Sequence, residues 1–401
     1  MRRVWSYLGS RESYRVLKLL CRGKSSDRGK RRVVFYLNHP VVLDHFFPIF
    51  QNLDPQTFSV MFRENSPGFP TNYRSLLVSK LHRDVEIIDF SEADRAGRTW
   101  RVGISIISLE EKSFDFFLIR AKLEHGIYDY RGDSYGPVNR AYDAVLCHGP
   151  YSARRLEESW GVRTFQIGYP KYSNLLKNSP SGSDYRRVLG VKDDQILATW
   201  LPTLDEENSI GRFCEEFKSL PNNIFLVAQI HPLTALRQPD QVDAMVESGI
   251  TILDDYAEFK LPDILLGSDV TLHDFGGIGQ AAIFLRSNPL FLTFPDHLLR
   301  ANGNLIPEAL VRAEVGGVGA GMVSQAIVEA VDKSEVEFQR RQKLDGLRSL
   351  FFSGNDGADA KHASEAVQYL ANRPILAVLL DRSQISRSFR RLVARFARPL
   401  Q

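Results

Sequence analysis

The sequence predicts an α/β protein made of two doubly wound domains. Short β-rich apolar runs alternate with helical segments in two successive series, one on each side of the polar stretch 177–185. The length of 401 residues is enough for two or three domains. With 43% hydrophobic and 25% charged residues, the composition is that of an ordinary globular protein, which disfavours disorder, collagen-like repeats and coiled coils.

The first series starts at Val33, after a polar segment at 23–30. Residues 33–38 (VVFYLN) are typical of a buried strand, and the apolar residues between Leu43 and Leu53 recur at helical spacing. A helix is predicted between Tyr151 and Trp160. Further strands are predicted at 58–62, 85–90, 114–119, 142–147 and 164–168.

The second series follows Gln195. Strands are predicted at 196–200, 224–229, 250–255, 269–273 and 289–294, and helices at 210–220 and 239–247 separate some of them. Pro239 suits the first position of its helix, where no N–H is needed. Beyond Pro307 the pattern is mostly helical. We therefore predict domains at 33–180 and 186–375, with a hinge within 177–185 and basic end segments at 1–32 and 376–401.

Missing motifs exclude several chemical classes. No GxxxxGK[ST], HExxH or Asp-x-Asp sequence occurs, which disfavours P-loop phosphoryl transfer and the metal-dependent enzymes with these signatures; no metal or cofactor is predicted. The GxSxG letters at 132–136 lie in a polar loop followed by Pro137, which predicts an exposed turn. Cys21, Cys147 and Cys214 are far apart, which favours a reducing cytoplasm over disulfides or zinc. No apolar run reaches the ~20 residues of a membrane-spanning helix.

The candidate site residues follow predicted strands directly, because ligands of open parallel sheets bind beyond the carboxyl ends of the strands. In the first domain this position belongs to Glu124-His125-Gly126. A histidine there is able to remove a proton from an alcohol at neutral pH, since its ordinary pKa is near 6.5. A loop histidine bonded to backbone explains the same pattern, so His125 is a candidate catalytic base.

In the second domain three strand ends carry suitable groups. Thr203 follows the first strand, as a phosphate contact or a helix N-cap, and His231 follows the second, as a phosphate donor or a capping residue. The turn 273–280 (HDFGGIGQ) joins a strand to a helix; its glycines would let phosphate approach the backbone N–H groups, or they make only a tight connection. The predicted nucleotide or phosphate ligands are Thr203, His231, Asp274, Gly276, Gly277 and Gln280.

These strand ends occur in the order of a known family. Residues 142–176 (YDAVLCHGPYSARRLEESWGVRTFQIGYPKYSNLL) hold a strand, a Pro-Tyr-Ser helix and a Gly-Tyr-Pro turn, and strands ending in Pro-Thr (197–207) and His-Pro (226–232) and the segment 250–277 follow. Over residues 114–300 the set resembles the CDP-glycerol glycerophosphotransferases of the teichoic-acid polymerase type. The resemblance implies a GT-B architecture, with an acceptor domain and a nucleotide domain facing a cleft. It implies that His125 is the catalytic base and that Thr203, His231 and the 274–279 turn hold the donor diphosphate.

Three places depart from the family pattern. Ile127-Tyr128 stand where the family has Thr-Pro, Asp205 stands for an Arg, and Gly276-Gly277 replace a Ser-Ser pair, so backbone N–H groups must replace two hydroxyl donors. The glycine pair also resembles the UDP-N-acetylglucosamine 2-epimerases, but the carboxylates that this family uses on the ribose are missing. The departures concern the identity of the donor more than the fold.

The two ends of the chain are strongly basic. Residues 1–32 carry a net charge of +9 and residues 381–401 carry +5, whereas residues 33–380 carry −11. Phe389, Leu392, Val393 and Phe396 share one helical face among arginines, a pattern that suits the surface of an anionic bilayer. The aromatic and aliphatic content favours lipid over nucleic acid. Packing of these faces on the acidic body is the alternative.

The sequence thus predicts a cytoplasmic transferase at the inner face of the cell membrane. It would move glycerol phosphate from a nucleotide-diphosphate donor such as CDP-glycerol to a hydroxyl of an acceptor. The acceptor would be a cell-surface glycan or teichoic-acid-like polymer, either as a glycan or in a lipid-linked form. The alternatives are a sugar transferase with a UDP-linked donor, an epimerase-like enzyme and a nucleotide-binding protein without turnover.

Overall fold

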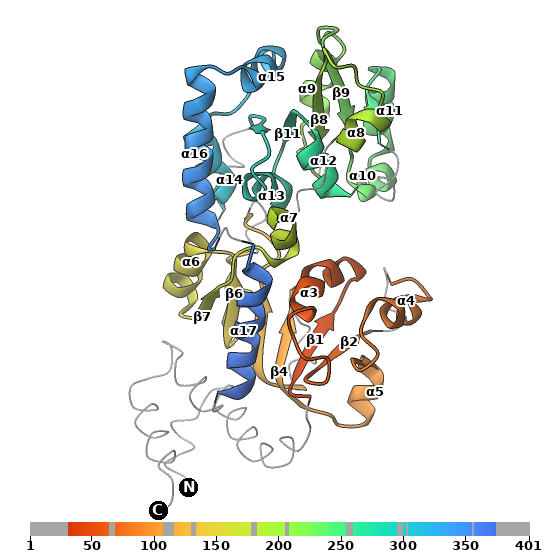
Figure 1. The fold of residues 1–401 in the computed structure, drawn as a ribbon, viewed down its shortest axis with the longest axis vertical. Helices are drawn as coiled ribbons and strands as arrows, with labels where there is room; N and C mark the ends of the chain where they lie inside the picture. The colour runs from red at the N-terminus through yellow and green to blue at the C-terminus, as the bar shows by residue number, and fades with distance from the viewer. Residues whose placement is uncertain are drawn as a thin grey trace, which may run out of the picture.

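Two parallel sheets form the two lobes of the molecule (Figure 1). The computed structural model describes residues 31–63, 69–106, 116–129, 134–177, 183–204, 208–253, 260–294, 300–301, 304–354 and 357–373. Apart from Arg31 and Arg32, the basic end segments expected to bind a membrane lie outside these residues.

The first lobe is built on seven parallel strands in the order β3-β2-β1-β4-β5-β6-β7. The buried Phe35 in the centre of the sheet meets the rings of Phe46 and Phe50 edge-on at 5.0 and 4.8 Å, so the helix after the first strand covers this face. The elements are β1 (Val33–Leu37), α3 (Leu43–Phe50), β2 (Phe58–Phe62), α4 (Tyr73–Lys80), β3 (Glu86–Asp89), α5 (Phe90–Arg95), β4 (Trp100–Ser105), β5 (Phe117–Leu123), β6 (Ala144–Cys147), α6 (Pro150–Trp160) and β7 (Arg163–Gln166).

The second lobe has five parallel strands in the order β10-β9-β8-β11-β12. Its core is centred on the fully buried Trp200, whose ring lies 4.6 Å from that of Phe217 and whose indole N–H donates to Ser209 Oγ. The elements are α8 (Ser183–Val188), β8 (Ile196–Leu201), α9 (Ile210–Phe217), β9 (Ile224–Ala228), α10 (Pro232–Arg237), α11 (Pro239–Glu247), β10 (Thr251–Ile252), α12 (Leu261–Gly267), β11 (Val270–His273), α13 (Gly277–Phe284), β12 (Pro289–Phe291), α14 (Pro307–Val315), α15 (Val323–Val331) and α16 (Glu335–Phe351).

Short elements connect these layers. The turns η1 (Pro40–Val42), η3 (Pro137–Ala141) and η4 (Pro170–Tyr172) are 3-10 helices, and α7 (Ser173–Lys177) follows η4. The strands β13 (Arg300–Ala301) and β14 (Asn304–Leu305) form an antiparallel pair. In the described ranges, no helix is both long enough and apolar enough to cross a membrane.

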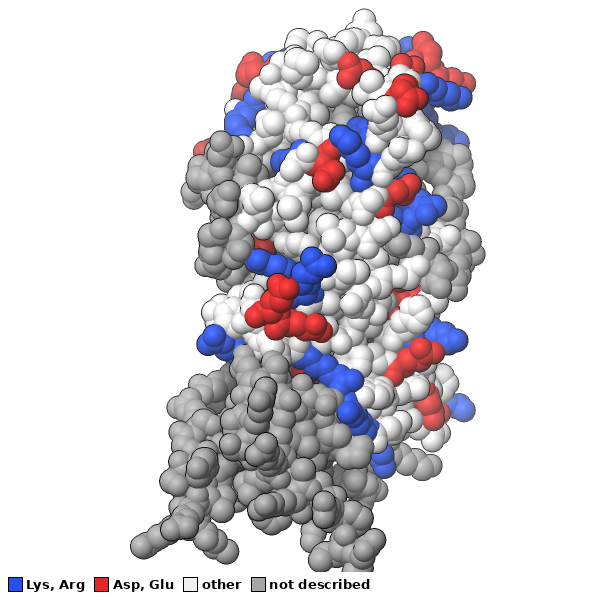
Figure 2. Space-filling model, turned by 90° about the vertical axis from the view of Figure 1, so that its left-hand side faces the viewer, with Lys and Arg blue, Asp and Glu red and all other residues white. Residues whose placement is uncertain are grey.

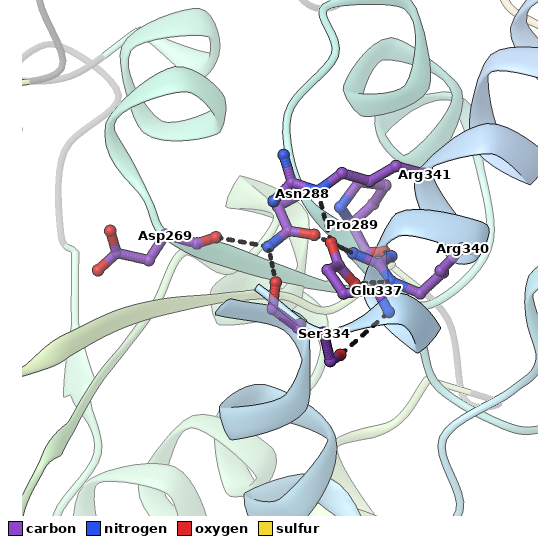
Figure 3. A network of polar contacts seen from close by, with 8 residues as sticks. Asp269, Asn288, Pro289, Ser334, Glu337, Arg340 and Arg341 are labelled. Atoms are coloured by element: carbon purple, nitrogen blue, oxygen red, sulfur yellow. Dashed lines mark hydrogen bonds and ion pairs between the residues drawn. The ribbon is translucent and has the colours of Figure 1, made fainter. Parts of the chain in front are cut away.

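A polar network fixes α16 to the second sheet (Figure 3). The amide of Asn288 donates to the backbone carbonyls of Asp269 and Ala330 at 3.0 and 2.8 Å and accepts from Arg340. Arg340 also donates to the carbonyl of Pro289, and it forms a 2.7 Å ion pair with Glu337, which is only 5% exposed. Because Glu337 and Arg340 lie on α16 and Asn288 precedes β12, the network holds the long helix against the edge of the sheet.

After α16 the chain returns to the first lobe. Figure 1 shows α17 (Asp359–Asn372), the last helix described, beside the first sheet rather than the second. Ala363, Val367 and Leu370 are buried in the same cluster as Val102 and Ile104 of β4. The predicted second domain, 186–375, therefore includes a helix that belongs to the core of the first lobe. The helical pattern predicted α17 but did not specify which sheet it covers.

The predicted α/β class with two doubly wound domains is confirmed, and the differences are local. β4 was not predicted, because Arg101 and Gly103 interrupt its apolar pattern. A Cβ atom at Gly103 would lie 2.2 Å from Cγ of Phe117, so only glycine lets this ring pack against the strand. The strand predicted at 250–255 is described only as Thr251–Ile252, and residues 178–182 of the predicted hinge lie outside the described part of the chain.

Candidate functional site

The carboxyl ends of the two sheets meet at two glycines. The loop after β5 contains Gly126, and Gly277 begins α13 after β11. A methyl group at Gly126 would lie only 3.6 Å from the Cα atom of Gly277, and one at Gly277 would lie 3.5 Å from the ring of Tyr128. The structure thus brings together the two loops, from different lobes, that the sequence nominated for the acceptor base and the donor phosphates.

His125 lies at this junction with its ring partly accessible. Its Nδ1 atom lies 2.9 Å from the hydroxyl of Tyr128, and its ring lies 4.7 Å from the ring of His45 at an angle of 33°. Burial, followed by the positive charge of Lys171, lowers the pKa of His125 to about 4. The imidazole is therefore neutral at pH 7. With Nδ1–H donating to Tyr128, Nε2 keeps a lone pair that is able to accept a proton.

Glu124 anchors the loop that carries His125. Its carboxylate accepts hydrogen bonds from the backbone N–H of His148 at 2.7 Å, from Ser152 Oγ at 2.7 Å and from the Tyr135 hydroxyl at 3.0 Å. The side chain is only 6% exposed, so these three donors compensate for its removal from water. They tie the end of β5 to the end of β6 and to the start of α6, which positions His125 between the lobes.

His45 and Lys171 complete the first-lobe side of the site and were not predicted. His45 comes from α3 and Lys171 from η4, which packs against α3. The Nζ atom of Lys171 lies 3.5 Å from Nε2 of His45. Burial and then the charge of Lys171 lower the pKa of His45 well below 6.5. The sequence held a signal for His45, since it falls within the first turn of the helix that follows β1.

The turn before α13 is shaped by glycine. Gly276 has a φ of +94°, in the region that other residues avoid, and it caps the helix that starts at Gly277. Thr203, at the end of β8, faces this turn, since a methyl group at Gly276 would lie 3.9 Å from its Oγ1 atom. Backbone N–H groups at a helix start and a neighbouring hydroxyl are the donors that phosphate oxygens need.

Asp274 holds the loops of this edge together. Its Oδ2 atom accepts from the backbone N–H groups of Thr203 and Ser209 at 3.0 and 2.9 Å. The side chain is 2% exposed, and burial raises its pKa. The predicted phosphate ligand Asp274 is thus a positioning residue for Thr203 in this structure.

Arg312 and Glu308 of α14 form hydrogen bonds with the backbone of the turn before α13, and sequence reasoning missed both residues. Arg312 donates to the backbone carbonyls of Asp274 and Leu292, both at 2.8 Å, and to that of Glu308 at 3.1 Å. The N–H of Gly276 donates to Glu308 Oε1 at 3.3 Å. Burial raises the pKa of Glu308 to about 7. Both residues lie more than 30 positions after Gly276, in a segment without any strand-end motif.

The remaining predicted residues lie at the same edge of the second sheet. β9 and β11 both lie next to β8 in the second sheet. His231 follows β9 and is half-buried just before α10, whereas Thr203 follows β8, so the two residues come after neighbouring strands. Gln280 is 1% exposed on α13. Within the described ranges, several buried polar atoms of this region make no hydrogen bond: the Gln229 amide, the Thr234 hydroxyl and the Gln280 carbonyl oxygen. Such groups normally have partners, so a polar ligand or water is expected here.

In the part of the chain that the structure describes, no group of three His, Cys, Asp or Glu side chains is arranged to hold a metal ion.

Three buried histidines and the half-buried His125 make the stability of the fold dependent on pH. The pKa values of His45, His125, His148 and His273 are all lowered, mainly by burial, and that of His273 is about 3. The folded state then binds fewer protons than the unfolded state, so this stability is complete above about pH 6.5 and is lost as the pH falls toward the lowered values. The raised pKa values of Glu308 and Asp274 act in the opposite direction and offset part of the loss.

We expect the free energy of unfolding to fall between pH 7 and pH 5, by up to about 1.4 kcal/mol per pH unit for each buried histidine. Urea unfolding at pH 7, 6 and 5 measures this slope. His273→Gln retains a donor for Thr271, which lies 2.8 Å from His273 Nε2, and should reduce the slope by up to one proton. His82→Gln, at an exposed position, is the control and should leave it unchanged. An equal slope in the His273 variant would contradict the assignment.

Comparisons with solved structures support the architecture. No protein-family model and no curated protein matches the sequence. The structure of the wall teichoic acid polymerase TagF superposes with a TM-score of 0.59 at 14% identity, over 89% of this chain and 96% of that one. A TagF variant soaked with CDPG gives the same TM-score at 12% identity. HepE of Anabaena, in complex with UDP and glucose, gives 0.55 at 12% identity over 86% of this chain and 100% of that one.

At this level of identity the likeness shows the fold. The two lobes, the parallel sheets and the meeting of their carboxyl edges define a protein of the GT-B class. The GT-B architecture that the resemblance implied is thereby confirmed, and the expectation of a chain similar in fold to the teichoic-acid polymerases is confirmed with it.

Proposed function

We propose that this chain is a GT-B transferase that moves glycerol phosphate from a nucleotide-diphosphate donor such as CDP-glycerol to a hydroxyl of a cell-surface glycan or teichoic-acid-like polymer. One observation carries the proposal: a neutral histidine from one lobe lies beside a helix-capping glycine turn from the other. A base on one side and phosphate donors on the other are what group transfer from a nucleotide donor requires.

The reaction uses these groups in a single displacement. Nε2 of His125 takes the proton of the acceptor hydroxyl as its oxygen bonds to the phosphorus that carries glycerol. The bond from that phosphorus to the bridging oxygen breaks, and the nucleoside monophosphate leaves with the electron pair. Backbone N–H groups at the start of α13, the hydroxyl of Thr203 and the imidazole of His231 would stabilise the charge on the leaving group.

The ligands of the similar structures agree with a nucleotide donor. The TagF variant was soaked with CDPG, and HepE was solved with UDP, with UDP-glucose and with UDP and glucose. A sugar transferase with a UDP-linked donor is the second candidate, and the glycine pair at 276–277 favours it, because these positions lack the hydroxyl donors of the polymerase family.

Nucleotide binding identifies the donor. We expect one of CDP, UDP, CMP and GDP to raise the melting temperature most, because a ligand that binds only the folded state stabilises it. Gly277→Val should reduce this shift in melting temperature, since the valine methyl groups would occupy the space between the glycine turn and Tyr128. His231→Ala should also reduce it, because it removes a hydrogen-bond donor to phosphate. Gly346→Val on α16 and the exposed His82→Ala are the matched controls. Normal shifts in both site variants would place the nucleotide elsewhere.

We propose that the basic ends bring the enzyme to the inner face of the membrane. On the face of the described residues that Figure 2 shows, Lys and Arg are intermixed with Asp and Glu, whereas residues 1–32 alone carry +9. Each basic residue near an anionic surface contributes about 1 kcal/mol, and salt screens this attraction.

Binding to anionic vesicles should therefore fall at high salt without vanishing, because the apolar face with Phe389 and Leu392 adds a contribution that salt leaves in place. Removal of residues 1–30 and 383–401 should abolish sedimentation with vesicles and preserve activity on a soluble acceptor. Undiminished sedimentation of the shortened chain would show that the body carries the membrane contact.

A further inference from the structure

The first-lobe side of the site contains a lysine without an acidic partner. Lys171 is half-buried in η4. Its Nζ atom lies 3.5 Å from His45 Nε2 and 5.4 Å from the centre of the Tyr172 ring. Among the described residues, no carboxylate forms an ion pair with Lys171. Glu124, a buried acid at this edge of the first lobe, is occupied by three hydrogen bonds to other groups.

The surroundings of Lys171 increase the need for an anion. The pKa values of His45 and His125 are both lowered, so the two imidazoles are neutral at pH 7, and the charge of Lys171 contributes to both shifts. A partly buried positive charge beside neutral rings is costly unless an opposite charge joins it. Since the described part of the protein supplies none, the geometry calls for one from a ligand.

The position of Lys171 assigns this anion to the acceptor rather than to the donor. His125 stands between two groups of residues. On one side, Gly126 and Tyr128 contact the glycine turn of the second lobe. On the other side, its ring packs on that of His45, which in turn contacts Lys171. A hydroxyl that reacts at His125 therefore has the donor phosphates on the second-lobe side and Lys171 on the first-lobe side.

We propose that Lys171 and His45 form a subsite for a phosphate group of the acceptor, next to the hydroxyl that reacts. Lys presents a compact charge with three donors that suit phosphate oxygens. The neutral ring of His45 accepts from the Lys171 ammonium through Nε2 and so orients it. The inference rests on the proposed function, in that it takes His125 as the base for the acceptor hydroxyl, and it extends that function by naming the chemistry of the acceptor.

The probe is sn-glycerol 3-phosphate, which carries hydroxyls and a phosphate, with glycerol as its neutral match. Calorimetric titration of the full chain measures binding without any turnover. We expect Lys171→Met to weaken glycerol 3-phosphate binding about tenfold, because a charge-assisted contact is lost. Lys171→Arg should retain affinity within threefold. Lys122→Met is the matched control: this lysine also lies near His125, but it donates to Asn139 Oδ1 at 3.0 Å, and its removal should change affinity less than twofold.

Titration of the same variants with the preferred nucleotide separates the two phosphate sites and checks that each variant is folded. We expect Lys171→Met to leave nucleotide affinity unchanged and Gly277→Val to weaken it. Unchanged glycerol 3-phosphate binding by the Lys171 variant would overturn the subsite, and so would a wild type that does not bind this probe. Loss of the probe in Gly277→Val but not in Lys171→Met would place the probe in the donor turn and overturn it as well.

Turnover then tests the proposed function separately. With the preferred donor, Lys171→Met should raise KM about tenfold for a phosphate-bearing acceptor and leave the KM of a neutral acceptor nearly unchanged. A wild type that binds glycerol 3-phosphate through Lys171 but transfers nothing would refute the transferase and leave the anion subsite intact.

Discussion

His125→Asn should lower kcat by roughly 10²–10⁴, because no other group would accept the proton of the attacking hydroxyl. Asparagine lacks the Nε2 atom but places its amide where Nδ1 lies, so it keeps a polar contact with the Tyr128 hydroxyl, which lies 2.9 Å from Nδ1 in the native protein. Nucleotide affinity should stay nearly the same, since the donor turn belongs to the other lobe. Initial rates at saturating donor, together with nucleotide titration, measure both quantities.

Tyr128→Phe is the companion variant for this experiment. It removes the hydroxyl that orients the ring of His125 but keeps the apolar contact with Gly126. We expect a smaller loss of kcat than for His125→Asn, because the base remains present. Full turnover by the His125 variant would refute its role as the base, whichever donor proves correct.

Arg312→Met should lower the free energy of unfolding by about 3–5 kcal/mol, the second large effect. The guanidinium donates to three backbone carbonyls, those of Leu292, Asp274 and Glu308. The Glu308 carbonyl lies within α14 and keeps its helical hydrogen bond, so removal of the side chain would leave the buried carbonyls of Leu292 and Asp274 without this partner. Each unsatisfied buried group costs about 1–3 kcal/mol. Burial lowers the pKa of Arg312 to about 10, so the side chain is still charged at pH 7 and its loss also leaves Glu308 without a neighbouring cation.

Arg212→Met is the matched control, because Arg212 makes one hydrogen bond, to the carbonyl of Thr293, at an exposed position. Urea unfolding of both variants should show a loss several times larger for Arg312. Nucleotide affinity should also fall in the Arg312 variant, since the carbonyl of Asp274 fixes the turn that precedes α13. Equal stability of the two variants would show that the carbonyls of Leu292 and Asp274 find other partners.

Each part of the site that the sequence predicted lies within a short continuous segment of its own. His125 and the glycine turn each follow a strand directly, and strand ends are visible as a change from apolar to polar residues. Gly276 and Gly277 were nominated because glycines at a helix start let phosphate approach the backbone N–H groups, and a tight connection was the alternative. Their contact across the lobes was expected only from the family resemblance, because no local pattern specifies how two sheets face each other.

The residues that were missed act over long distances in the chain. His45 and Lys171 are 126 positions apart, and Arg312 lies 38 positions after the carbonyl that it supports. Neither pair forms a periodic pattern or a motif, and their proximity results from sheet order. Asp274 was predicted as a ligand because a carboxylate at a strand end is so often one. Burial and two backbone N–H groups instead direct it toward the loop of Thr203.

The return of α17 to the first lobe has a consequence for folding during synthesis on the ribosome. Strands β1 to β7 leave the ribosome before the second lobe, yet Ala363, Val367 and Leu370, which cover part of their sheet, are synthesised after it. At a translation rate of about 5–20 residues per second, roughly 10–40 s pass between the synthesis of β7 and that of α17. The second lobe is continuous from α8 to α16, so it is able to finish folding during this interval. The nascent chain should therefore expose the apolar surface around Val102 and Ile104 until α17 has emerged, and this surface is where chaperones are expected to bind.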